Sequence, residues 1–125
     1  MLASVRREIE AVERSSVGRP YMDLTLKDAD GETVALSSLA GPGRWVLLDF
    51  WATWCGPCCR EIPYLKEAYA AFSGRGFAIY AVSIDHDAAR WQRVIAENDL
   101  PWTNVLSPGC GRQSPAAAMY GIRFI

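Results

Sequence analysis

The sequence has few of the features expected of a protein that binds nucleic acid or spans a membrane. Its 13 Lys and Arg are offset by 14 Asp and Glu, which leaves a formal net charge of −1 and no basic stripe. The longest apolar run, residues 45–55, is interrupted by Asp49 and is far below the roughly 18 residues of a membrane span. Near the N-terminus, charges begin at Arg6, too early for the apolar core of a signal peptide. We therefore expect no nucleic-acid partner.

The composition predicts one small globular domain. The chain has 125 residues, of which 50% are hydrophobic and 22% charged, enough apolar material for a single core. Residues 2–14 carry a narrow apolar stripe at helical spacing among charged side chains, which predicts a short helix. This helix either packs on a sheet or ends an upstream linker. We assign residues 1–16 to an N-terminal helix or linker and residues 17–125 to the domain.

The most informative segment joins a predicted strand to a predicted helix. Residues 45–51 are rich in β-branched and aromatic side chains and follow a Gly-Pro-Gly turn, which is typical of a buried strand. After the segment Trp54–Cys58, apolar residues recur at helical spacing as far as a pair of glycines. Their positions are Cys58, Ile62, Leu65, Tyr69 and Phe72, closed by Gly74 and Gly76.

Two cysteines three residues apart at a helix start can form a reversible redox couple. The free N–H groups and the positive end of the helix dipole favour a thiolate at Cys55, and Pro57 suits the first turn. We expect an exposed Cys55 to attack a substrate disulfide, and a more buried Cys58 to resolve the mixed disulfide. The alternatives are half of a zinc site or an inert structural disulfide.

Asp49 is a carboxylate in the middle of an apolar strand. Because burial disfavours the charged form, we expect the pKa of Asp49 to be raised, so that it can accept the proton of Cys58. The alternative is a polar residue near the strand end whose hydrogen bonds are satisfied.

The remaining pattern alternates strands with helices. Asp30 and Gly31 mark a hairpin between residues 21–26 and 33–36, and residues 77–84 read as a central buried strand. Residues 88–98 and 115–120 are predicted helices, with a further strand at 102–106. In the predicted helix 88–98, we expect Trp91, Val94 and Ile95 to face the core. The fold class is therefore α/β with a mixed sheet flanked by helices.

Residues 49–58, Asp-Phe-Trp-Ala-Thr-Trp-Cys-Gly-Pro-Cys, resemble the active-site segment of the thioredoxin superfamily. The flanking residues 17–41 and Glu61-Ile62-Pro63 resemble the TlpA/ResA-like thiol-disulfide oxidoreductases of the AhpC/TSA–Redoxin-like branch. The resemblance implies a thioredoxin-like fold, with Cys55 as nucleophile and Cys58 as resolving cysteine. It also implies proton-transfer roles for Asp49 and Glu61, although Glu61 could equally be a solvated first-turn carboxylate. The motif residues that face substrate would be Trp54, Gly56 and Pro57.

The resemblance also implies partners and a compartment. We expect disulfide-containing protein substrates, a dithiol electron donor, and neither cofactor nor metal. Relatives often work outside the cytoplasm, so we expect a periplasmic or envelope location, with any membrane anchor in a removed upstream segment. The Cys-Gly-Pro-Cys sequence favours a reductase, with a potential near roughly −270 mV.

Two other functions remain open. A thiol peroxidase of the same superfamily would need proline at position 48 and threonine at position 52, where the chain has Leu48 and Ala52. A non-catalytic binding or metal-holding module is the other alternative.

Two departures from the family pattern stand out. The stretch 80–85 lacks the lysine that usually faces the buried aspartate, which should raise the pKa of Asp49 further. The family's cis-proline and its last strand hairpin and helix would follow residue 125, so we expect a chain cut short of them. An unpaired sheet edge should result, and a dimer or strand exchange could cover it.

Three remaining residues have candidate roles. Cys59 is about 100° around the helix from Cys58 and is expected to be a half-buried filler. Cys110 lies in a Gly-rich loop and is expected to be solvent-exposed, with a second redox partner or a metal ligand as alternatives. His86, the only histidine, is expected to cap the turn before residues 88–98. A zinc site built from Cys55, Cys58, Cys110 and His86 has suitable ligand types, but nothing in the sequence brings Cys110 or His86 close to the pair.

Overall fold

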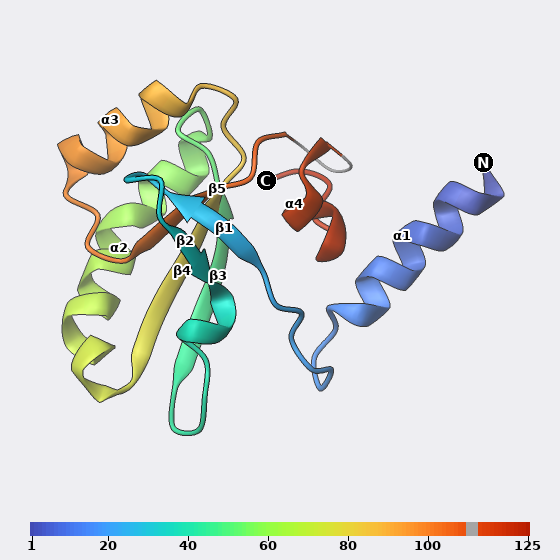
Figure 1. Cartoon of the computed structure of the whole chain (residues 1–125), viewed down its shortest axis with the longest axis horizontal. Helices are drawn as coiled ribbons and strands as arrows, with labels where there is room; N and C mark the ends of the chain where they lie inside the picture. Colours follow the sequence, from blue (N-terminus) through green and yellow to red (C-terminus); the bar gives the residue numbers. More distant parts are fainter. Residues whose placement is uncertain (110–112) are drawn as a thin grey trace.

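A computed structural model describes residues 1–109 and 113–125 and has a five-stranded mixed sheet with helices on both faces (Figure 1). The strand order is β2-β1-β5-β4-β3, with β3, β4 and β5 parallel and the β1–β2 and β1–β5 pairs antiparallel. The strands are β1 (Thr25–Asp28), β2 (Thr33–Ala35), β3 (Trp45–Trp51), β4 (Phe77–Ser83) and β5 (Thr103–Leu106). The helices are α1 (Leu2–Arg14), α2 (Gly56–Phe72), α3 (Ala88–Asn98) and α4 (Pro115–Met119), with short 3-10 turns at Leu36–Ser38 and Ser73–Arg75.

One face of the sheet is covered by α2 and α3. Both helices connect parallel neighbours, α2 between β3 and β4 and α3 between β4 and β5, so both cross on the same side. The core on this face includes Trp51 from β3, Ile79 from β4, Ile62 from α2 and Trp91 from α3. The predicted apolar stripe of α2 lies against this core as far as Tyr69, but Phe72 at its end is 49% exposed, which corrects that part of the prediction.

The other face of the sheet packs against α4 and the 3-10 turn after β2. Tyr80 and Val82 of β4 are fully buried there beside Leu36 and Ala116. Since Tyr80 and Val82 alternate with Ile79 and Ala81 along β4, the strand supplies both cores, which explains its continuous apolar run.

The predicted hairpin is confirmed, although β1 begins at Thr25, four residues after the expected start at residue 21. Asp28 closes its turn by accepting the N–H groups of Asp30 and Glu32, each at 2.9 Å. Gly31 has φ +81°, the left-handed conformation for which glycine is suited.

The N-terminal helix α1 does not pack on the sheet, which overturns that alternative. Figure 1 shows it to one side of the sheet, and it lines a hollow together with α4 and the chain after α4. Arg123 pairs with Glu8 at 3.4 Å, and Ser15 donates its hydroxyl to the Tyr120 carbonyl at 3.1 Å. The predicted apolar stripe is exposed along its whole length, with Leu2, Val5, Ile9 and Val12 between 46% and 86% exposed.

Among the described residues, β3 forms one edge of the sheet and pairs with β4 alone. Trp45, at its start, is 77% exposed. Within residues 1–109 and 113–125, no helix combines the length and apolarity needed to cross a membrane.

Candidate functional site

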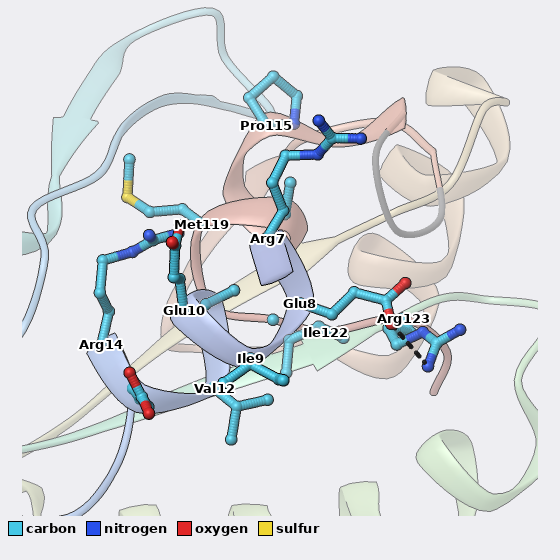
Figure 2. Close-up of a pocket in the computed structure, with 14 residues that line it drawn as sticks. Arg7, Glu8, Ile9, Glu10, Val12, Arg14, Pro115, Met119, Ile122 and Arg123 are labelled. Carbon is cyan, nitrogen blue, oxygen red and sulfur yellow. Dashed lines mark ion pairs between the residues drawn. The ribbon is translucent and has the colours of Figure 1, made fainter. Parts of the chain in front are cut away.

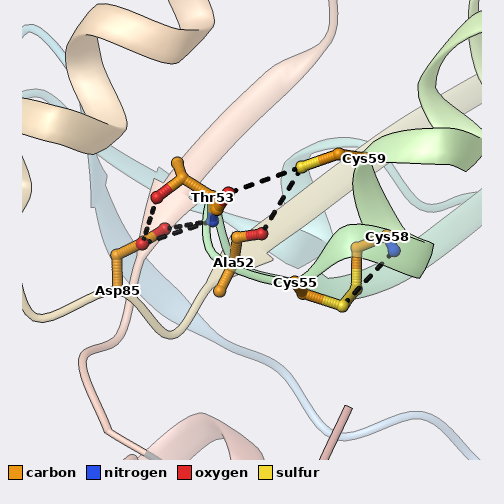
Figure 3. Close-up of a disulfide and its surroundings, with 6 residues drawn as sticks. All are labelled: Ala52, Thr53, Cys55, Cys58, Cys59 and Asp85. Atoms are coloured by element: carbon orange, nitrogen blue, oxygen red, sulfur yellow. Dashed lines mark hydrogen bonds between the residues drawn. A yellow bond between two sulfur atoms is a disulfide. The ribbon is translucent and has the colours of Figure 1, made fainter.

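The cysteine pair lies where β3 passes into α2. Four residues, 52–55, form the link, and Cys55 is the N-cap of α2, with Pro57 in the first turn. Cys55 and Cys58 form a disulfide, with their Cα atoms 5.3 Å apart. The backbone N–H of Cys58 donates to the Cys55 sulfur at 3.3 Å (Figure 3). The nucleophile predicted from the sequence therefore lies at the positive end of α2.

The relative burial of the two cysteines is opposite to the prediction. Cys55 is only 5% exposed, and Cys58 is intermediate. Cys55 packs in a small cluster with Ala52 and Ile84, and Ile125 lies against this cluster from the other end of the chain. The expected exposure assumed a helix start open to solvent. It is wrong because the end of β4 and the last residues of the chain meet at this point.

The predicted substrate-facing residues are the exposed part of the motif. Trp54 is 52% exposed, and Gly56 and Pro57 are exposed as well. An aromatic side chain and the first turn of α2 thus border the pair on the solvent side.

Asp49 is on the face of β3 that α2 covers. It is two residues before Trp51 and in register with Ala81, and both of these belong to the core beneath α2. Burial raises the pKa of the Asp49 carboxyl, and the negative charge of Glu61 adds to the rise. The effect of Glu61 places an exposed carboxylate of α2 in electrostatic range of Asp49.

A second buried carboxylate, Asp85, has no role in the sequence prediction. It directly follows Ser83 and Ile84 at the end of β4, is 1% exposed, and accepts hydrogen bonds from Thr53 in the β3–α2 link (Figure 3). The signal in the sequence was an acidic residue directly after a strongly apolar strand, whereas Asp49 was recognised as an acidic residue within one.

The other candidates are placed as follows. The side chain that caps α3 is Asp87, which accepts the Arg90 N–H at 3.1 Å, so the prediction for His86 is wrong and His86 is exposed. Cys59 is half-buried, as predicted, and its thiol is directed at the carbonyls of Thr53 and Ala52, 3.6 and 3.9 Å away. Cys110 lies outside the described residues.

A hollow of about 1070 Å³ lies away from the cysteines, between α1, α4 and the end of the chain (Figure 2). Charged side chains of α1 surround it, and neither Cys55 nor Cys58 lines it. The hollow is a consequence of α1 standing off the domain and does not belong to the redox pair.

Comparison with known proteins places this geometry in a family. The model of the AhpC/TSA family matches residues 17–124. A curated relative, thiol-disulfide oxidoreductase ResA of Oceanobacillus iheyensis, is 43% identical over 88 residues, 67% of this chain and 45% of its own length. The chain spans about half the length of the curated relatives it matches.

Solved structures agree with the fold. The thioredoxin domain of a thiol-disulfide oxidoreductase from Bacteroides vulgatus is 37% identical, with a TM-score of 0.67 over 73% of this chain and 64% of that one. The C-terminal domain of a putative thiol-disulfide oxidoreductase from Bacteroides thetaiotaomicron is 28% identical, with a TM-score of 0.77 over 90% of this chain and 77% of that one. With its thioredoxin-like sheet and its Cys-Gly-Pro-Cys pair at the start of α2, the chain belongs to the AhpC/TSA family and is a ResA-like member of the thioredoxin superfamily.

Proposed function

We propose that this domain is a thiol-disulfide oxidoreductase that reduces or exchanges disulfides in proteins. The observation that carries the proposal is the position of Cys55, which caps α2, accepts the Cys58 N–H and is disulfide-bonded to Cys58. A cysteine pair at a helix N-terminus that forms and breaks its disulfide transfers two electrons in each cycle. The names of the similar proteins support the same activity.

The reaction has two steps. The Cys55 thiolate attacks one sulfur of a substrate disulfide, forming a mixed disulfide and releasing the other substrate sulfur as a thiolate. Cys58 then gives its proton to Asp49 and attacks the Cys55 sulfur, which closes the Cys55–Cys58 disulfide and expels the second substrate thiolate. The substrate gains two electrons and the dithiol loses them, and a dithiol donor restores the pair.

The two carboxylates have separate parts in this proposal. The raised pKa of Asp49 makes it a stronger base than an ordinary aspartate, which suits acceptance of a thiol proton. Glu61 holds that pKa up by its charge, and from its position one turn of α2 after Cys58 it takes part in the proton transfer.

Trp54, Gly56 and Pro57 form the exposed border on which a substrate would bind. We propose protein substrates and a small or protein dithiol as donor. From the family resemblance we further propose a location outside the cytoplasm, and a unit of residues 17–125 preceded by the helix within residues 1–16.

A peroxidase reaction receives less support. Position 52, next to Cys55 in its cluster, holds Ala52, which is fully buried and offers no hydroxyl to a peroxide. The pair also lies within one disulfide, which is the arrangement of a dithiol mechanism.

Reduction of insulin disulfides by dithiothreitol tests the proposal. The wild-type domain should accelerate precipitation of the insulin B chain, and Cys55→Ser should abolish the acceleration. Thr33→Ser, at an exposed position on β2, is the control variant: prepared and assayed at the same concentration, it should match wild type. Equal rates for wild type and Cys55→Ser would refute the dithiol mechanism.

A further inference from the structure

Asp85 is a buried carboxylate that the dithiol reaction does not use. Its Oδ1 accepts the Thr53 hydroxyl at 2.6 Å, and its Oδ2 accepts the Thr53 N–H at 3.0 Å. The Ser83 hydroxyl also donates to Oδ2, and the Asp85 N–H donates back to the Ser83 oxygen at 3.0 Å. A carboxylate with three donors in a dry site is a fixed anchor, because each lost bond would leave a buried polar group unpaired.

The anchored residue, Thr53, lies two positions before Cys55. Figure 3 shows Asp85 on one side of the link and the cysteines on the other. On the cysteine side, the Cys59 thiol donates toward the Thr53 carbonyl at 3.6 Å, and the Cys55 N–H donates to the Ala52 carbonyl at 3.1 Å.

The link is thus held at successive points. Before it, the Ile84 N–H donates to the Trp51 carbonyl at 2.9 Å, joining the end of β3 to the end of β4. After it, the Cys59 N–H donates to the Cys55 carbonyl at 3.1 Å within the first turn of α2. Between these two backbone contacts, the Thr53 hydroxyl and N–H tie the link to Asp85, two residues after the end of β4.

We propose that Asp85 and Thr53 form a clamp that holds Cys55 as the N-cap of α2 and thereby sets its reactivity. Both are positioning residues, since neither forms a hydrogen bond with the sulfur of Cys55 or Cys58. The proposal rests on the proposed function, in which Cys55 is the nucleophile.

The clamp matters because the stabilisation of a thiolate at a helix start is short-ranged. The Cys55 sulfur accepts the Cys58 N–H at 3.3 Å, and a displacement of about 1 Å would remove that hydrogen bond and carry the sulfur away from the dipole. Loss of the Thr53 hydroxyl would allow such a displacement, because it breaks the 2.6 Å contact to Asp85 Oδ1 and leaves only the Thr53 N–H to join the link to this carboxylate.

The charge-neutral pair Thr53→Val and Thr53→Ser separates this role from a general effect on folding. Valine keeps the shape of threonine but removes the hydroxyl donor, while serine keeps the donor. Both variants keep every titratable and charged group of the chain, including Cys55, Cys58, Cys59, Asp49, Arg60, Glu61, Asp85 and His86 on the elements that meet at the link. A change in Cys55 reactivity therefore reports geometry rather than charge.

The measurement is the rate at which iodoacetamide alkylates Cys55 in the reduced protein between pH 5 and 9, followed by mass spectrometry of the Cys55 peptide. Thr53→Val should lower the rate at pH 7 by about tenfold and move the pH midpoint upward, and Thr53→Ser should stay within about twofold of wild type. Asp87→Asn, in the same turn but outside the clamp, should match wild type.

The clamp would be overturned if folded Thr53→Val had the same alkylation rate and pH midpoint as wild type. It would also be overturned if Thr53→Ser slowed alkylation of Cys55 as much as Thr53→Val does. If Thr53→Val does not fold by circular dichroism, Ser83→Ala takes its place, because it releases the orientation of Asp85 without touching the link. Alkylation needs no disulfide substrate, so failure of insulin reduction would count against the proposed function alone. Unchanged alkylation in an active enzyme would count against the clamp alone.

Discussion

The backbone N–H of Cys58 is directed at the sulfur of Cys55 across 3.3 Å, so one residue of the pair caps the helix that carries the other. The contact uses the backbone of Cys58, not its thiol. A substitution at position 58 can therefore remove the second sulfur while leaving the environment of the first intact.

Cys58→Ser should accumulate a mixed disulfide. Cys55 keeps its N-cap position and attacks substrate, but no thiol remains to resolve the intermediate. Incubation with insulin followed by non-reducing electrophoresis and mass spectrometry should show an adduct on Cys55. Cys55→Ser is the matched control and should form no adduct at position 58. An adduct on Cys58 in Cys55→Ser, with none in Cys58→Ser, would reverse the two roles; this comparison is informative because Cys55 is the more buried of the two.

Asp49→Asn should slow the resolving step by about a hundredfold, the usual loss when a general base is removed. Only the ionised carboxylate accepts a proton, and burial raises the pKa of Asp49, so the wild-type rate should rise with pH above the range of an ordinary aspartate. The variant should lose this rise. Stopped-flow release of substrate thiol between pH 4 and 8 measures the effect, with Asp30→Asn, in the exposed hairpin turn, as control. An unchanged profile would remove Asp49 from the mechanism.

Glu61→Gln should move the same rise in rate to lower pH. The charge of Glu61 contributes to the raised pKa of Asp49, and its removal lets Asp49 ionise more easily. The plateau rate should stay within about twofold. Glu67→Gln, an exposed position on the same helix, is the control and should not move the profile. A fall in the plateau would indicate instead that Glu61 itself carries the proton.

Much of this arrangement follows from local sequence pattern. The bounds of β3 and α3 agree with the sequence prediction, because β3 is a short apolar run, α3 has one apolar face, and both have clear turn residues at their ends. Asp49 could be recognised as unusual because it interrupts an apolar run. Local pattern was also sufficient to place Cys55 at a helix start.

The parts that could not be predicted depend on contacts between distant segments. The burial of Cys55 comes from Ile84 and Ile125, which lie 29 and 70 residues away in the sequence. The partner of Asp85 is Thr53, 32 residues earlier. The choice between His86 and Asp87 as cap depended on where α3 begins, and a shift of one residue decided it.

The ionisation of Asp49 should make the fold less stable as pH rises. With its pKa raised in the folded state, Asp49 holds a proton more tightly there than in the unfolded chain. The protonated Asp49 carboxyl therefore adds its full stabilisation to the free energy of unfolding below the ordinary aspartate pKa, near 3.9. This stabilisation is lost as the pH rises through the raised pKa of the folded state. Urea unfolding of the oxidised protein from pH 4 to 7 should show Asp49→Asn gaining stability relative to wild type. A constant difference across this range would contradict the raised pKa.

Gly76→Ala should destabilise the domain by roughly 2 kcal/mol or more, since strained positions of this kind cost about 1–3 kcal/mol each before any clash. Gly76 has φ +91°, and a Cβ there would lie 2.5 Å from the carbonyl oxygen of Gly43, in the segment before β3. Its own carbonyl accepts the Trp45 N–H at 2.8 Å, so relieving the clash would pull apart the starts of β3 and β4. Gly74→Ala is the matched control, because no atom lies within 4 Å of its Cβ position and its φ is not positive; it should be neutral or stabilise by about 0.4–1 kcal/mol. Urea unfolding of the three proteins at one pH measures both effects, and equal stabilities would show that the β3 and β4 starts tolerate the displacement.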